Sequence, residues 1–183
     1  MSVTLPALPR QTRVTPTYRD FSARLTPPAG GQEQRVGRLG DRWAVRFTLP
    51  PMGEAQALAF VAAQTRSITE GATLRGVVPR QGDAPTGVSG VGAVNATTVA
   101  ASSVAGVKVG MMFSFEAGGH AYLHQVTGIT GSNLNVAPRL RAAANGALNF
   151  AAPVVEGFLT ETVSWDAERL AHSGVSFTIA EDR

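Results

Sequence analysis

The chain has 183 residues and a hydrophobic fraction of 44%, enough to bury the core of one sizeable domain or of two small ones. The absence of cysteine excludes disulfides, Cys-ligated zinc, iron–sulfur clusters and cysteine nucleophiles. The net charge of +3 comes from scattered arginines and a single lysine with few aromatics between them, which argues against a dedicated nucleic-acid-binding domain.

Prolines mark the beginning of the chain, at Pro6, Pro9, Pro16, Pro27 and Pro28. Because proline fixes φ and removes a ladder donor, we predict an extended arm or edge segment here, loose until it packs on a neighbour. The first twenty residues lack the apolar stretch of a signal peptide. No apolar run approaches the roughly 20 residues of a membrane span, so we expect neither secretion nor contact with a membrane.

A strand followed by a helix is predicted next. Residues 41–49 alternate, which would bury Trp43, Val45, Phe47 and Leu49 and leave Arg42 and Arg46 on the other face. After two prolines the period changes, and we predict the single helix at about 52–68. Its apolar stripe would consist of Leu58, Val61 and Ala62, with Glu54 near the positive end of the helix dipole. A short strand at 72–79 follows.

From residue 80 the composition shifts to Gly, Ala, Val, Ser and Thr. We predict a small antiparallel β-barrel over 86–152, with hairpin turns at 117–119 and 130–132. Its strands are expected near 91–99, 111–117, 120–129, 132–138 and 147–152. The glycines of GVSGVG lack the strand–turn–helix context of a nucleotide loop and are interpreted as turns.

Two further strands, about 155–165 and 174–181, end the chain, and the second alternates with Val175, Phe177 and Ile179 on one face. They should pair with the early strands, since neither set makes an adequate sheet alone. The predicted fold is therefore mainly β. A β-sandwich or split-barrel domain of residues 1–85 plus 153–183 carries the helix, and the small barrel of 86–152 is inserted into it.

Two histidines, His120 and His124, resemble a metal site at first sight. On a strand they would lie about 13 Å apart, too far to share one ion. Glu116 is expected to face His120 across the hairpin as a cross-strand pair. We therefore predict no metal site and no bound cofactor.

Catalytic patterns are equally weak. There is no G-x-S-x-G sequence, and His172 has no obvious orienting acid. The carboxylates Glu161, Asp166 and Glu168 are interpreted as a solvated face near the chain end, since a glycosidase-like cleft would want more aromatics than two Trp and two Tyr. The chain is not expected to be an enzyme.

Charge is uneven along the chain, with eleven Arg against six acids in residues 1–85, and two Arg against six acids in residues 153–183. This asymmetry suits contacts between copies, and it also suits neutralisation within one chain. Arg139 and Arg141, which follow Pro138, are predicted to project the same way. Together with Arg42 and Arg46 they are the candidate partner contacts, since Arg pairs bidentately with carboxylates and phosphates.

Taken together, residues 35–183 resemble the minor tail proteins of long-tailed bacteriophages, in particular the distal tail proteins that join the tail tube to the tip. The resemblance rests on short structural motifs, with one departure at Met111, where Asp is usual. The matching positions are Arg42-Trp43, Leu49-Pro50, Gly110, His124-Gln125-Val126, Pro138 to Arg141, and Phe177 to Asp182.

The resemblance implies a structural virion component that forms a ring, expected to be a hexamer, at the phage tail tip after assembly in the bacterial cytoplasm. Residues 1–85 plus 153–183 would stack on the tail tube protein, and the barrel would project outward. The implied partners are other copies of the chain, the tail tube protein, the tail tip or hub proteins and the tape measure protein. DNA would pass through the channel without base recognition.

Two alternatives stay open. The barrel could be a carbohydrate-binding module that attaches the particle to its host, for which Phe113, Phe115, Tyr122 and Phe150 are the available rings. The chain could also be the tail-tube subunit itself, which would form long polymers instead of closed rings.

Overall fold

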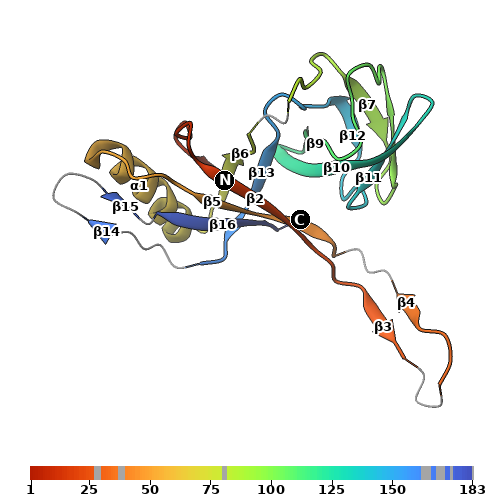
Figure 1. Ribbon diagram of the computed structural model, residues 1–183, viewed down its shortest axis with the longest axis horizontal. Coiled ribbons are helices and arrows are strands. Elements are labelled where there is room, and N and C mark those ends of the chain that lie inside the picture. The colour runs from red at the N-terminus through yellow and green to blue at the C-terminus, as the bar shows by residue number, and fades with distance from the viewer. Residues whose placement is uncertain are drawn as a thin grey trace.

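The computed structural model describes residues 1–26, 30–36, 40–79, 82–161, 166–167, 172–173 and 175–182. In these ranges the chain is mainly β with one helix, and most strands belong to two six-stranded sheets (Figure 1). This confirms the predicted fold class. The predictions for Pro27, Pro28 and Glu168, and for the side chain of His172, fall outside what the structure describes.

The first sheet combines the two ends of the chain. Its order is β1 (Ser2–Thr4), β6 (Thr73–Val77), β13 (Val154–Leu159), β16 (Ser176–Glu181), β5 (Arg42–Thr48) and β2 (Arg13–Arg19). Only β1 and β6 are parallel neighbours. The late strands pair with the early ones, as predicted, although β13 ends at Leu159 and not near residue 165.

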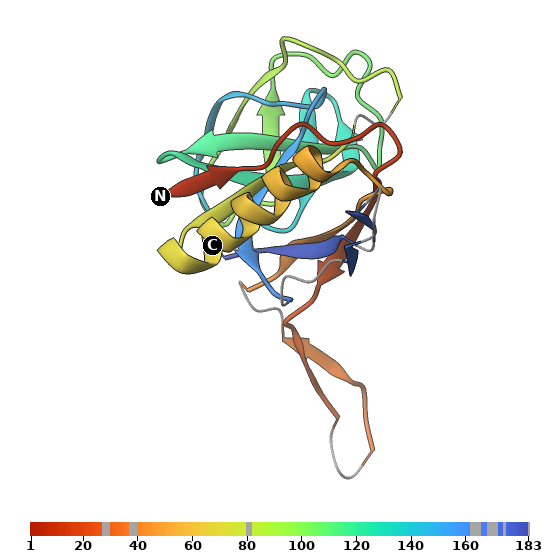
Figure 2. The ribbon, with the colours of Figure 1, turned by 90° about the vertical axis from the view of Figure 1, so that its left-hand side faces the viewer.

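The N-terminal segment forms both edges of this sheet, which confirms the predicted edge segment for its first 19 residues and rules out a loose arm there. β1 and β2 are the two edge strands. Pro16 lies in β2, where an edge position tolerates the missing N–H. Beyond β2, strands β3 (Ala23–Leu25) and β4 (Gln34–Val36) form a hairpin that extends away from the body (Figures 1 and 2).

Helix α1 (Glu54–Glu70) covers one face of the first sheet (Figure 2). It runs two residues past the predicted end because Gly71 adopts a left-handed φ of 58° and its N–H bonds to the Ile68 carbonyl. Of the predicted apolar stripe only Val61 is buried, since Leu58 is 48% exposed and Ala62 is exposed as well. Packing of the large Phe60 turns another stripe inward, which consists of Ala57, Phe60, Val61, Gln64 and Ser67. In the described residues no helix is long and apolar enough to cross a membrane.

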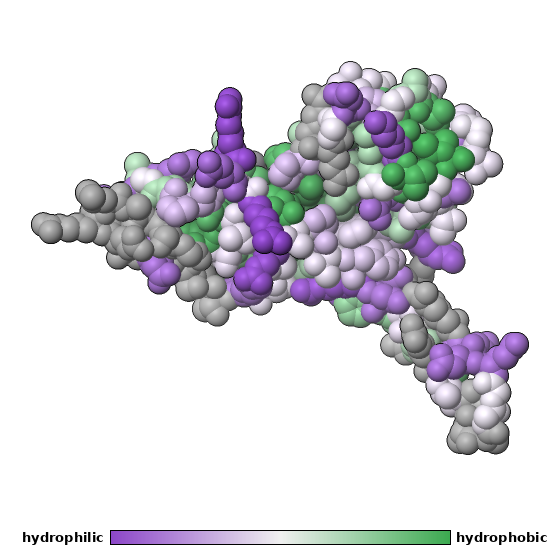
Figure 3. Space-filling view, viewed as in Figure 1, coloured by the Kyte–Doolittle hydropathy of each residue, from purple (hydrophilic) through white to green (hydrophobic). Residues whose placement is uncertain are grey.

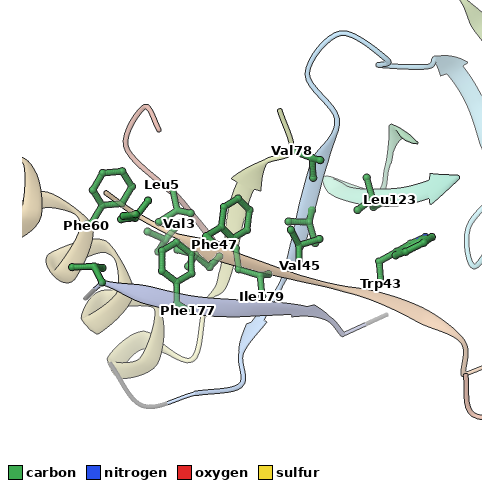
Figure 4. Packing of buried hydrophobic residues seen from close by; sticks show 14 of the residues in the cluster. Val3, Leu5, Trp43, Val45, Phe47, Phe60, Val78, Leu123, Phe177 and Ile179 are labelled. Carbon is green, nitrogen blue, oxygen red and sulfur yellow. The ribbon is translucent and has the colours of Figure 1, made fainter. Parts of the chain in front are cut away.

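The core between α1 and the first sheet contains the predicted strand faces. Phe47 of β5 stacks on Phe177 of β16 with ring centroids 5.2 Å apart. Leu123, from the second sheet, joins the same cluster near Trp43 (Figure 4). The buried faces predicted for residues 41–49 and 174–181 are confirmed, because the predicted residues are all buried: Trp43, Val45, Phe47, Leu49, Val175, Phe177 and Ile179. Burial does not alternate strictly, since Ala44, Thr178 and Ala180 on the opposite face are buried too.

The second sheet is antiparallel and nearly closed. Its order is β12 (Ala144–Ala147), β7 (Ser89–Gly92), β8 (Thr98–Ala101), β11 (Asn133–Ala137), β10 (His120–Thr130) and β9 (Met112–Ala117). A bridge between Ser114 and Asn149 brings the two ends of the sheet together. It has its own hydrophobic cluster, drawn from residues 84–150. The division of the chain into two domains stays a prediction.

Strand boundaries in this sheet correct two predictions. The strand expected at 91–99 is two strands, β7 and β8, because Asn95 has a φ of 67° that interrupts extended backbone. The strand expected at 147–152 lies earlier, as β12. The hairpin turns are confirmed, with positive φ at Gly118, Gly119 and Gly131. A short two-stranded pair, β14 (Asp166–Ala167) and β15 (His172–Ser173), completes the described elements.

Candidate functional site

Two buried glutamates join the barrel to the first sheet. Strand β11 pairs with β10 only from Gln125 onward, which leaves the first half of β10 with a free edge. There the N–H groups of Ala121 and Leu123 donate to the carboxylates of Glu156 (2.9 Å) and Glu181 (2.7 Å). The two side chains thus satisfy backbone donors that a neighbouring strand would otherwise take.

Glu156, on β13, is the more heavily bonded of the two. It accepts from the Thr73 hydroxyl (2.7 Å) and Arg75 Nε (2.7 Å), and it lies 2.9 Å from Nδ1 of His120. Burial alone raises the pKa of Glu156, but the N–H of Ala121, the hydrogen bonds of Thr73 and His120 and the charge of Arg75 together hold it below its usual value. The carboxylate therefore stays ionised and paired inside the chain.

Glu181, the last residue of β16, is 1% exposed. Its Oε2 accepts from the Trp43 N–H (3.0 Å) and lies 2.7 Å from Nη2 of Arg141. Burial raises the pKa of Glu181 to about 7, even though Arg141 and the N–H groups of Leu123 and Trp43 oppose that shift. A carboxyl group with such a pKa changes its charge near neutral pH.

The predicted cross-strand pair of Glu116 and His120 is wrong by one residue of register. Glu116 lies opposite Ala121, and its carboxylate instead pairs with Nη1 of Arg75 at 3.1 Å. His120 turns to Glu156. Because Arg75 also bonds Glu156, the cluster includes groups from both sheets and neutralises charge within one chain.

His124 lies on the same strand but in the barrel core, fully buried between Phe113 and Phe115, with ring centroids 5.8 and 5.3 Å away. Burial, and after it the charge of Arg141, lowers the pKa of His124 to about 4. Neither ring nitrogen makes a well-formed hydrogen bond. Within the described ranges no three His, Asp or Glu side chains gather as metal ligands would.

The four predicted partner arginines lie in three places. Arg42 and Arg46 share a face of the first sheet, and Arg139 is exposed on the barrel. Arg42 is half-buried, since its Nη1 donates to the Glu181 carbonyl (3.1 Å) and its guanidinium lies 4.8 Å from the Phe21 ring. Arg141 faces the Glu181 carboxylate of its own chain, and its role as a partner contact stays a prediction.

Sequence reasoning missed Glu156 and Glu181, since it assigned acids near the chain end to a solvated face. One signal could have found Glu181. The alternation of Val175, Phe177 and Ile179 continues to position 181, which places this glutamate on the buried face. Arg75 and Glu156 carry no comparable signal, because their partners lie far away in the sequence.

The aromatic rings of the barrel are all in its core. Phe113, Phe115, Tyr122 and Phe150 are 0, 3, 8 and 2% exposed. Residues 86–152, which the structure describes completely, therefore present no ring on which a sugar could stack. A Tyr122→Ala substitution would test the packing of the barrel and not a glycan contact.

A cavity of about 590 Å³ lies between residues 4–12 and β6. Leu, Pro, Ala and Val form most of its wall, with Arg10 and Arg75 as the charged groups, and the wall contains neither an acid nor a histidine to activate a nucleophile.

A scan against protein-family models and a search of curated proteins each found no match for this chain.

Proposed function

We propose that this chain is a structural subunit of a long-tailed bacteriophage, a distal tail protein that closes into a ring, expected to be a hexamer, between the tail tube and the tip. The observation that carries this proposal is the β3–β4 hairpin. Among the described residues its two strands pair only with each other. Leu25 lies on the hairpin and is 54% exposed, and Phe21 lies just before it and is 41% exposed.

An isolated two-stranded hairpin is marginally stable in water. A hairpin that extends from the body and exposes apolar side chains is therefore suited to pack on another molecule. A neighbouring copy is the simplest partner, because a projecting element on one side and a receiving surface elsewhere make a heterologous contact. Repeated around an axis, such a contact closes into a ring.

The first sheet supports the same arrangement. It is open, with β1 and β2 at opposite edges, so each subunit can present a different edge to each neighbour. In the proposed ring the first sheet surrounds the channel, the barrel projects outward, and the tail tube protein, the hub proteins and the tape measure protein are the neighbours along the tail axis. The subunit would act in the virion.

The test is the mass and shape of the purified full-length chain, by light scattering and negative-stain microscopy. We expect annular particles with six times the 19.0 kDa mass of the chain. The double variant Phe21→Ser/Leu25→Ser should shift the population to smaller species. A double variant on the barrel, Val91→Ser/Val109→Ser, removes two apolar side chains that are 63 and 62% exposed and should leave the rings intact.

Three results would contradict the proposal. The first is a wild-type chain that stays monomeric at its highest soluble concentration, and the second is rings that survive the hairpin variant unchanged. The third is open filaments of unlimited length, which would favour the tail-tube alternative.

A further inference from the structure

The pairing of β2 with β5 gathers four arginines on one side of the first sheet. Residues directly opposite each other in an antiparallel pair share a face. The register sets Arg13 against Thr48, Thr15 against Arg46, Thr17 against Ala44, and Arg19 against Arg42. The other face of β5 carries Trp43, Val45 and Phe47, which are buried in the core. The face with the arginines, called here the Arg/Thr face, is therefore turned away from the core.

The neighbouring strand β16 borders this face with buried residues, since Thr178 and Ala180 are each 8% exposed, and Ala44 of β5 is 2% exposed. On β16, Thr178 lies opposite Arg46 and Ala180 opposite Ala44, so short side chains stand between the arginines. Arg13 and Arg19 are six residues apart, about 20 Å along the strand. Figure 3 shows hydrophilic residues over the part of the surface where β2, β5 and β16 lie in Figure 1.

The positive charge of this face is not neutralised by the described part of the chain. Arg13 and Arg46 are exposed and Arg19 is half-buried, and no ion pair between described residues involves any of the three. Arg42 alone is held in place, by the Glu181 carbonyl.

Two nearby acids, Asp41 and Glu161, form hydrogen bonds with other groups and no ion pair with these arginines. Asp41 accepts from the Tyr18 hydroxyl (3.0 Å) and the Phe21 N–H (2.8 Å). Glu161 accepts from the Thr178 hydroxyl (2.9 Å). Three guanidinium groups therefore remain available to an anionic partner.

We propose that the Arg/Thr face contacts the phosphate backbone of double-stranded DNA, without reading its sequence. Arginine and threonine side chains are common donors to phosphate oxygens. A duplex carries one charge per roughly 1.7 Å of its axis, so a row of cations about 20 Å long meets several phosphates at once. An acidic protein would need carboxylates arranged in the same row.

The donor set also indicates why the contact is independent of sequence. No aromatic side chain belongs to this face within β2 and β5, and the ring beside it, Phe21, lies against the Arg42 guanidinium. A sheet face does not enter a groove as a recognition helix does. The inference rests on the proposed function, because the resemblance implies that DNA passes through the channel of such a ring, but binding by a single subunit can be measured by itself.

The expected strength follows from counterion release. Three free arginines give a slope of about −2.7 for the logarithm of the association constant against the logarithm of the salt concentration. Between 50 and 200 mM NaCl the affinity for a duplex should fall by about 40-fold. Removing two of the arginines should reduce the magnitude of this slope by about 1.8, to about −0.9.

The experiment measures fluorescence anisotropy of a labelled duplex of random sequence against the full-length chain over a series of NaCl concentrations. The variant is Arg13→Gln/Arg46→Gln. The control is Arg66→Gln/Arg139→Gln, which removes the same charge from exposed residues of α1 and the barrel. Poly-glutamate, added as a competitor, distinguishes phosphate from carboxylate recognition.

We expect the variant to lose most of the affinity and about two thirds of the salt slope, and the control to keep both. Equal losses in both variants would overturn the inference, and so would the absence of duplex binding. Poly-glutamate that binds while the duplex does not would assign the face to an acidic protein instead. Rings without DNA binding refute this inference alone, whereas DNA binding without rings refutes the proposed function alone.

Discussion

Replacing Glu181 with Gln should change how the stability of the protein depends on pH. The Glu181 carboxyl group is buried, accepts two backbone N–H bonds and lies 2.7 Å from Arg141. Its pKa in the folded protein is about 7, against 4.5 for an unperturbed glutamate. Glutamine has nearly the same shape and stays neutral at every pH. Its amide nitrogen cannot accept the second N–H, but this loss is the same at every pH.

The sign follows from proton binding. A carboxyl group whose pKa is raised by folding binds more protons in the folded than in the unfolded state between pH 4.5 and 7. The free energy of unfolding of the wild type should therefore fall as the pH rises through this window. A shift from 4.5 to about 7 corresponds to about 3 kcal/mol. Glu181→Gln lacks this loss, so the variant should gain about 3 kcal/mol relative to the wild type between pH 4 and pH 8.5.

The assay is urea denaturation of both proteins across this range at one protein concentration. His124 also titrates there, but it is present in both proteins, so the difference between them isolates Glu181. Glu161→Gln, at an exposed glutamate, controls for the loss of one negative charge. If the wild type gains stability relative to Glu181→Gln as the pH rises, the Arg141 pair outweighs burial and the reasoning is wrong.

Three further substitutions test other parts of the fold, each by urea or thermal denaturation. His124→Leu removes a buried imidazole whose pKa is lowered from 6.5 to about 4; it should gain about 3 kcal/mol over the wild type between pH 7.5 and pH 4, and a constant difference would contradict this. Gly157→Ala would place a Cβ against the Ala180 carbonyl and should lower the free energy of unfolding by about 3 kcal/mol. An unchanged stability would mean that β13 and β16 move apart at no cost. Gly53→Ser supplies the side-chain cap that α1 lacks, into open space; it should stabilise by about 0.5 kcal/mol, a rise in Tm of about 1–2 °C, and no rise would mean that the cap does not form.

The parts of the fold that sequence could predict are those decided by local patterns. Alternation over 41–49 and 174–181 identified β5 and β16 and their buried faces, because one face of each strand contributes to the same buried cluster as α1. The Gly-Gly turn at 118–119 identified the β9–β10 hairpin, since both residues need positive φ.

The parts that it could not predict depend on register and on distant partners. In α1 the apolar residues do not form a single clean stripe, and only packing of Phe60 decides which side faces the sheet. Likewise, whether Arg141 faces solvent or a carboxylate depends on Glu181, forty residues away in the sequence. Of the four predicted partner arginines, the structure brings only Arg42 and Arg46 onto one surface.

The barrel enters the chain between β6 and β13, which are antiparallel neighbours in the first sheet. Both connections therefore leave from the same end of that sheet, and by themselves they would act as a two-stranded hinge. The contacts at the junction oppose such movement. Met112 and Leu123 of the barrel pack into the core of the first sheet. This packing resists separation of the barrel from the sheet, but it does not fix the orientation of the barrel.

Direction comes from the hydrogen bonds of Glu156 and Glu181 to two N–H groups on the same strand, two residues apart. Two directional hydrogen bonds to the edge of β10 fix the orientation of that strand. A single hydrogen bond would still allow the strand to rotate about the bond. At neutral pH Glu156 is ionised and Glu181 is close to its midpoint, so the two acceptors differ in charge. For a subunit that is proposed to hold the tail tube and a projecting barrel in fixed relation, burial of two carboxylates therefore has a mechanical rationale, despite its electrostatic cost.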